Sequence, residues 1–175
     1  TVRRVANCRG CLDRLLYFAV NSTAAVRDVA NCTSSFDTLM QGAKGSSVTV
    51  DGVVGITEGF SSLGRSARHS SVAFSNVQHI THAFPNIAMS ARNFTATFAD
   101  VADVIGSFSS ALFLASDCHF SVTRATRWAG SADFLGYSNS GSSLSFTHSS
   151  DVSGGAFDKA FQRSTECQAE FAHVS

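Results

Sequence analysis

The chain has 175 residues and a formal net charge of zero, from 13 basic and 13 acidic side chains. Hydrophobic residues make up 44%, enough for the core of one domain, and the chain is too short for two domains of ordinary size. A net charge of zero excludes a protein that relies on many phosphate contacts, so we expect no nucleic-acid partner. Only 15% of residues are charged, against roughly 25% in typical soluble domains. A surface this poor in charge favours a protein that is covered by a partner, by lipid or by both.

The first predicted element covers residues 4–41. Apolar residues recur there at alternating intervals of three and four, from Val5 through Leu12 and Val26 to Met40. Such spacing places them on one stripe of an α-helix. The stripe persists for about five heptads, which is typical of a coiled-coil seam.

Two further stripes predict long helices over residues 53–83 and 86–127. The helix over 53–83 ends before Pro85, because proline disfavours helical backbone in the residue that precedes it. The second ends with Arg124 and Arg127, whose positive charges suit the C-terminal end of a helix.

The end of the chain predicts an irregular connection and one short helix. Residues 128–153 are rich in Gly and Ser and show no helical stripe, whereas an apolar face returns over about 155–173. The sequence therefore predicts a single all-α domain over 1–175, with three long helices and one short helix in an up-and-down bundle. Four phenylalanines on the stripes are expected to be buried: Phe60, Phe74, Phe98 and Phe108.

The most apolar segment is Phe94–Ser116, which we expect to be a core helix or a helix lying in a membrane interface. Asp100 and Asp103 lie within it. Each would cost about 2.5–3.5 kcal/mol near the centre of a bilayer, which disfavours a spanning helix.

Cysteine and histidine offer the main candidates for chemistry. Cys8 and Cys11 form a CxxC motif, but no second pair of ligands stands at zinc-site spacing, so we expect no bound metal. His79 and His82 would share a helix face, and His119 lies on the third stripe. His79 and His82 are candidate ligands of a metal or a pigment, and His119 of a tetrapyrrole. A solvated or partner-facing position also explains His79 and His82, a core position explains His119, and we predict no cofactor.

The basic side chains predict an interaction surface, because arginines can meet a partner's carboxylates or lipid phosphates. They lie away from the stripes together with small serines that allow close approach of another helix. The residues of this predicted surface are Arg65, Ser66, Arg68, His69, Ser110, Arg124 and Arg127.

Three segments resemble the peroxin-eleven family of peroxisomal membrane-elongation proteins. They are Arg9-Gly-Cys-Leu-Asp-Arg-Leu-Leu-Tyr17, Glu58-Gly-Phe-Ser-Ser-Leu-Gly-Arg65 and Ala111-Leu-Phe-Leu-Ala-Ser-Asp117. The resemblance implies a helical membrane protein that inserts amphipathic helices, bends membranes and self-associates.

No catalytic motif stands out, so we expect a protein that is not an enzyme. The composition and the long stripes favour a structural subunit of a large complex at an organellar membrane, such as a photosynthetic or respiratory complex. Its expected partners are other protein subunits, themselves helical, with lipid contact in addition. Membrane remodelling of the peroxin-eleven kind, or pigment and cofactor binding by a helical protein, are the alternative functions.

Overall fold

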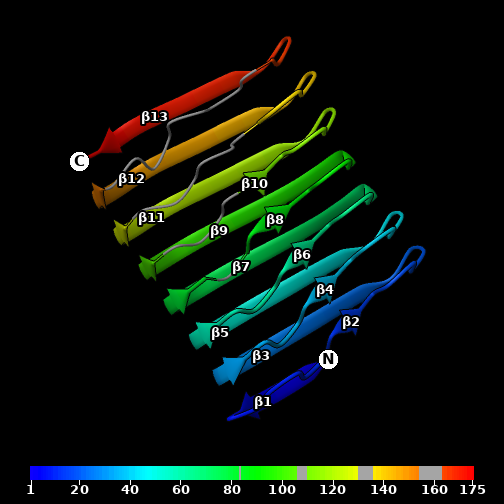
Figure 1. The fold of residues 1–175 in the computed structure, drawn as a ribbon, viewed down its shortest axis with the longest axis vertical. Helices are drawn as coiled ribbons and strands as arrows, with labels where there is room; N and C mark the ends of the chain where they lie inside the picture. Colours follow the sequence, from blue (N-terminus) through cyan, green and yellow to red (C-terminus); the bar gives the residue numbers. More distant parts are fainter. Residues whose placement is uncertain (83, 106–109, 130–135, 154–162) are drawn as a thin grey trace.

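The computed structural model consists of parallel β-strands stacked in chain order, with one long strand from each turn of the chain and a short strand after each of the first five long strands (Figure 1). It describes all residues except 83, 106–109, 130–135 and 154–162. The long strands are β1 (Val2–Ala6), β3 (Thr23–Thr33), β5 (Ser47–Thr57), β7 (Arg68–Thr81), β9 (Arg92–Ile105), β11 (His119–Ala129), β12 (Ser143–Ser153) and β13 (Gln168–Val174). The short strands are β2 (Arg14–Leu15), β4 (Thr38–Leu39), β6 (Ser62–Leu63), β8 (Asn86–Ile87) and β10 (Ser110–Ala111).

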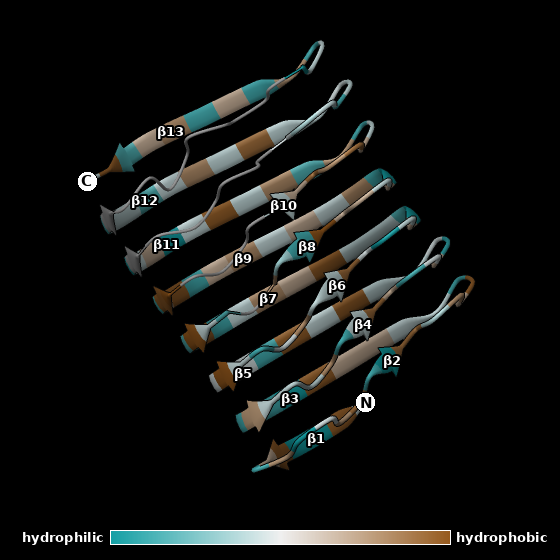
Figure 2. Ribbon diagram, in the orientation of Figure 1, coloured by the Kyte–Doolittle hydropathy of each residue, from teal (hydrophilic) through white to brown (hydrophobic). Residues whose placement is uncertain are grey.

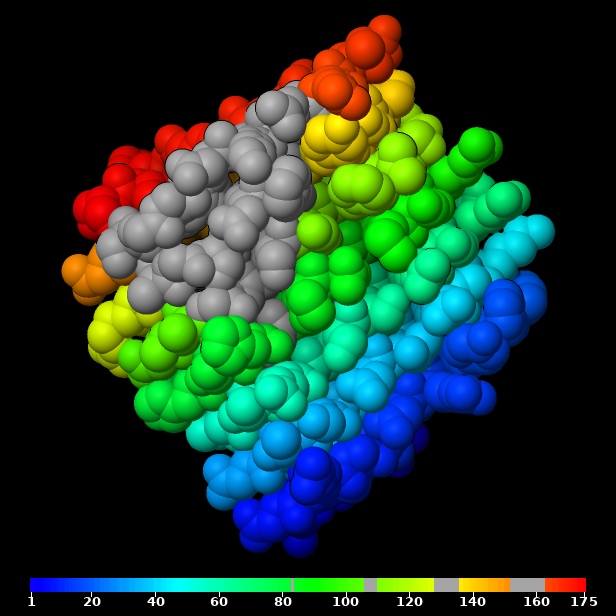
Figure 3. All heavy atoms as spheres, viewed as in Figure 1, coloured from blue at the N-terminus to red at the C-terminus, as the bar shows by residue number. Residues whose placement is uncertain are grey.

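The long strands form one eight-stranded sheet and the short strands form a second sheet of five. Nearly all neighbours pair in a register of 24 residues, as in Val26↔Val50, Val50↔Phe74 and Phe74↔Phe98. The fold is therefore a β-solenoid with a repeat of 24 residues. We call each repeat a coil, beginning at residues 1, 25, 49, 73, 97, 121 and 145, and we call the residues that stack at one register position a row. Figure 3 shows the successive coils as parallel bands.

Inward-facing side chains recur every two residues in the extended parts of the strands, as at Val48 and Val50, and every three or four residues where the backbone bends between them. In β3, Val26, Val29 and Cys32 are all buried, and Asp28 and Asn31 between them have φ values of 57° and 51°. A left-handed residue reverses the ordinary alternation of a strand, and Asp and Asn tolerate that conformation better than most residues. This backbone therefore reproduces the spacing of a coiled-coil seam without any helix.

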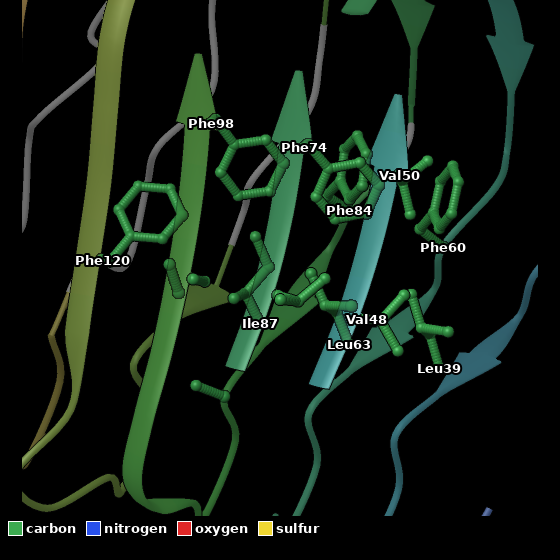
Figure 4. Close-up of a cluster of buried hydrophobic side chains, with 14 of the residues drawn as sticks. Leu39, Val48, Val50, Phe60, Leu63, Phe74, Phe84, Ile87, Phe98 and Phe120 are labelled. Carbon is green, nitrogen blue, oxygen red and sulfur yellow. The ribbon is translucent and has the colours of Figure 1, made fainter. Parts of the chain in front are cut away.

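The core lies between the two sheets and is dominated by stacked phenylalanines (Figure 4). Phe36, Phe60 and Phe84 form one row, with adjacent ring centroids 4.9 and 4.8 Å apart. Phe74 and Phe98 form a second row at 4.9 Å. Figure 2 shows hydrophobic residues recurring at matching levels of neighbouring strands. Because neighbouring coils bury their apolar residues against each other, the core of the described residues runs from Val26 to Phe146, and partly buried residues such as Val5 and Val174 pack against its ends.

Serine hydroxyls inside the bends accept hydrogen bonds from backbone N–H groups that have no partner in the strand ladders. The Ser46 hydroxyl accepts the N–H of Ser22 at 3.2 Å, and the Ser70 hydroxyl accepts the N–H of Ser46 at 3.2 Å. Ser142 accepts the N–H of Cys118 at 3.1 Å in the same row. These serines are buried, so part of the serine content belongs to the core and not to an outer face.

The all-α prediction is wrong, because the described residues form strands and no helix. Residues 4–41, 53–83 and 86–127 are not long helices, since each range contains long and short strands separated by bends. The expected connection at 128–153 contains β12, and the described end of the expected helix at 155–173 forms β13. Phe60, Phe74 and Phe98 are buried as expected, whereas Phe108 lies outside the described residues.

Candidate interaction surface

The outer face of the long sheet carries two rows of paired charges. Arg124 donates two hydrogen bonds to Asp100 in the neighbouring strand, at 2.6 and 2.7 Å. In the other row Arg127 forms the same bidentate pair with Asp103. Oδ2 of Asp103 also lies 3.2 Å from Nδ1 of His79. The opposite charges of these side chains neutralise each other across β7, β9 and β11. Little unpaired charge therefore remains for a partner.

The pairing lowers the pKa of several carboxyl groups below the ordinary value for Asp. Hydrogen bonds from Arg124 and Arg127 lower the pKa of Asp100 and Asp103 respectively. Hydrogen bonds from Ser75 and Asn76, at 2.6 and 2.7 Å, lower the pKa of Asp51. In each case the ionised carboxylate is the form that the neighbours bind.

Stability is expected to fall on acidification because of these carboxyl groups. Their pKa values are lower in the folded chain than in the unfolded chain, so the unfolded chain binds more protons as the pH falls. Their contribution is complete above the ordinary Asp pKa of about 3.9 and is lost as the pH falls through the lowered values. The measurement is the melting temperature of the wild type and of Asp100→Asn/Asp103→Asn between about pH 6 and 2.

The double variant should show a shallower decline than the wild type. Asp117→Asn is the control, because Asp117 forms no ion pair among the residues that the structure describes. A decline of equal steepness in the wild type and the double variant would contradict the assignment.

Three cations of consecutive coils stack in one row at the edge of the molecule. Lys44, Arg68 and Arg92 are all exposed, and Lys44 pairs with Arg68 in a parallel bridge. Arg68 pairs with Arg92 in the register of β7 and β9. We call these three residues the basic ladder. Neighbouring strands lie about 4.8 Å apart, and like charges placed directly opposite each other in a sheet are destabilising.

The basic ladder has no acidic partner within the described part of the chain. The three ion pairs there all belong to the charged rows of the long sheet. The ladder lies where each short strand bends into the following long strand, and these bends are stacked along one edge in Figure 1. The same bend of the third coil adds Arg65, and both Arg65 and His69 are exposed.

Exposed apolar residues begin the same edge in the first coil. Tyr17, Phe18 and Val20 are 41%, 62% and 61% exposed. We call the rows that begin with these three residues the corner strip; the basic ladder continues the row of Val20. From Tyr17 to Ser140 these rows contain no Asp or Glu. The adjacent row holds His69 and, two coils later, Asp117.

The structure brings together four of the predicted surface residues and separates the others from them. One exposed bend contains four residues of the predicted surface: Arg65, Ser66, Arg68 and His69. The remaining three residues of the predicted surface lie elsewhere: Ser110 in β10 and the Arg124 and Arg127 side chains on the long sheet.

Sequence reasoning missed Lys44 and Arg92 as companions of Arg68. A search for internal repeats at 24 residues would have aligned the three, because Lys44, Arg68 and Arg92 are evenly spaced by that interval.

The candidate cofactor ligands do not converge. His79, His82 and His119 are exposed side chains of different rows, and His79 is occupied by Asp103. His119 was expected on an apolar seam, and this is wrong because its row faces outward, where its Nδ1 meets the hydroxyl of Ser143. In the described part of the chain no three His, Cys, Asp or Glu side chains are grouped as a metal site.

Comparison with known proteins gives this chain no relative: no protein-family model, curated protein or solved structure matches it. The resemblance to the peroxin-eleven family therefore stays a prediction. Within the described ranges there is no helix with the length and apolar character needed to cross a membrane.

Proposed function

We propose that the chain is a non-enzymatic structural subunit that binds an acidic segment of another protein subunit along the corner strip. The observation that carries the proposal is the basic ladder: three stacked cations, exposed and without a carboxylate partner among the described residues. Their mutual repulsion is relieved when a row of carboxylates lies along them. Arginine suits this role because its planar guanidinium binds a carboxylate through two parallel hydrogen bonds.

The residues that flank the ladder favour a protein partner. Arg, Tyr, Phe and Met are enriched in protein interfaces, and aromatic residues and Arg supply most of their binding energy. The corner strip offers Tyr17 and Phe18 at its first coil and Arg65 and Met89 farther along. An extended partner segment with an apolar anchor and several carboxylates therefore matches the strip in both charge and hydropathy. An organellar membrane location of this assembly stays a prediction from the sequence.

A binding titration with a Glu-rich peptide tests the proposal. The variant Lys44→Ala/Arg68→Ala/Arg92→Ala should bind the fluorescently labelled peptide at least about tenfold more weakly than the wild type. This magnitude follows from three exposed ion pairs of about 0.5 kcal/mol each. The matched control is Arg3→Ala/Arg4→Ala/Arg9→Ala, which removes the same charge from exposed positions of the first coil and should retain the affinity.

Two results would contradict the proposal. Equal loss of binding in both variants would show that overall charge, and not the ladder, attracts the peptide. Binding to vesicles that contain an anionic phospholipid, with none to the peptide, would replace the protein partner by a lipid surface.

A further inference from the structure

Three cysteines of the first two coils are gathered at one end of the stack. The Sγ atoms of Cys8 and Cys32 lie 2.9 Å apart, and Cys8 Sγ lies 3.5 Å from the hydroxyl of Ser35. Cys11 is the third, and its backbone N–H donates to the same Ser35 hydroxyl at 3.2 Å. This group is separate from the corner strip, so an inference from it does not depend on the proposed function.

The stacking of the coils gives Cys8 and Cys32 the backbone separation of a disulfide. The register of β1 and β3 pairs Val5 with Val29 and Ala6 with Ala30, and the same offset of 24 residues joins Cys8 to Cys32. Directly paired residues of adjacent strands lie about 4.8 Å apart, within the range of about 4.4–6.8 Å over which disulfides join two Cα atoms. The two thiols can therefore be linked with little backbone movement.

The environment makes the two thiols unequal. Burial raises the pKa of Cys8, but the hydrogen bonds that Cys8 shares with Cys11, Cys32 and Ser35 outweigh it and lower that pKa below the ordinary value. Burial, followed by the hydrogen bond to Cys8, raises the pKa of Cys32 to about 11. Cys8 is half-buried and Cys32 is fully buried. The more accessible sulfur is thus also the better nucleophile.

We propose that Cys8 and Cys32 form a reversible disulfide that fastens the first coil to the second, with a peroxide as oxidant. The Cys8 thiolate attacks one oxygen of hydrogen peroxide, so an S–O bond forms, the O–O bond breaks, and hydroxide leaves to become water. The sulfur of Cys32 then attacks the Cys8 sulfenic acid. The S–S bond forms, the S–O bond breaks, and the departing hydroxide takes the proton of Cys32 as a second water. Two thiols are oxidised to one disulfide, and one peroxide is reduced to two waters.

The disulfide acts on an end coil of the stack. β1 pairs with β3 on one side only, and none of its residues is fully buried. An end coil of this kind opens more readily than the interior of a repeat stack. A covalent link from Cys8 to Cys32 closes that coil against its neighbour, and reduction releases it.

Tryptic mapping after peroxide treatment tests the inference on the unmodified chain. Cleavage after Arg and Lys places the three cysteines in different peptides, Val5–Arg9, Gly10–Arg14 and Asp28–Lys44. We expect Val5–Arg9 linked to Asp28–Lys44, with the loss of two hydrogens and release by dithiothreitol. Amide exchange of β1 should slow by about tenfold when the link is present.

The alternative links and the variants decide the pairing. Cys11→Ser should leave the link intact, and Cys8→Ser should abolish it. A link of Val5–Arg9 to Gly10–Arg14 would overturn the proposal, because it would make the CxxC pair the reactive one. Oxidation of Cys8 to sulfinic or sulfonic acid with no link, or a link between two chains, would overturn it as well.

Discussion

Phe74→Ala is expected to lower the free energy of unfolding by about 3–5 kcal/mol. The ring of Phe74 lies 5.1, 5.0 and 4.9 Å from the rings of Phe60, Phe84 and Phe98, so it joins the two aromatic rows of the core. Its removal leaves a cavity between coils that are held by strand ladders and cannot collapse freely. Since whole domains are stable by about 5–15 kcal/mol, urea titration should show a large shift of the midpoint.

Phe18→Ala is the matched control for this loss. Phe18 is 62% exposed, so the same chemical change should cost no more than about 1 kcal/mol. Equal shifts for the two variants, or an unchanged midpoint for Phe74→Ala, would contradict the arrangement of the aromatic rows.

The inward-facing residues could be predicted from the sequence, whereas their secondary structure could not. Val5, Leu12, Val26 and Met40 were placed on one stripe, and in the structure they lie in or against the core. The error arose because left-handed residues such as Asp28 let a β-solenoid coil bury residues at intervals of three and four. A heptad seam and this coil thus share one local hydrophobic pattern.

The distinguishing signal was the longer period. The stripe begins at Val5, and the register pairs Val5 with Val29, so this interval is one complete repeat of 24 residues. A helical seam has no reason to restart at that interval, whereas stacked coils require it. The same period also assembles the basic ladder and the Cys8–Cys32 pair from residues that are far apart along the chain. These sites follow from stacking, which no local pattern contains.

Gly64→Leu and Phe94→Ser are expected to destabilise the chain separately and to compensate each other when combined. A Cβ atom at Gly64 would lie 2.4 Å from Cζ of Phe94, and Phe94 is fully buried. The equivalent pair one coil earlier is Met40 and Ser70, and two coils later it is Leu112 and Ser142, all of them buried. In these two pairs the large residue belongs to the row of Gly64 and the small residue to the row of Phe94. The pair Gly64 and Phe94 has the opposite arrangement, with the small residue in the first row and the large residue in the second.

The backbone at Gly64 can accept a large residue. Gly64 has a φ value of 67°, and Met40 and Leu112 in the same row have φ values of 63° and 58°. A leucine is therefore compatible with this bend at a cost of about 1–2 kcal/mol, and the larger part of the effect of Gly64→Leu comes from the clash with Phe94. Gly52→Ala isolates the backbone cost, because Gly52 has a φ value of 68° and its nearest neighbour would lie 3.5 Å from the new Cβ.

A double-mutant cycle measured by urea unfolding tests whether Gly64 and Phe94 share one packing space. Gly64→Leu alone should cost about 2–4 kcal/mol, because overpacking adds to the backbone cost. Phe94→Ser alone should cost at least about 3 kcal/mol, since it empties a buried aromatic site. The double variant should be more stable than the sum of the two losses predicts, by about 1–3 kcal/mol, because leucine refills the space that Phe94 vacates. Simple addition of the two losses would show that the rows of Gly64 and Phe94 do not share one packing space across the coils.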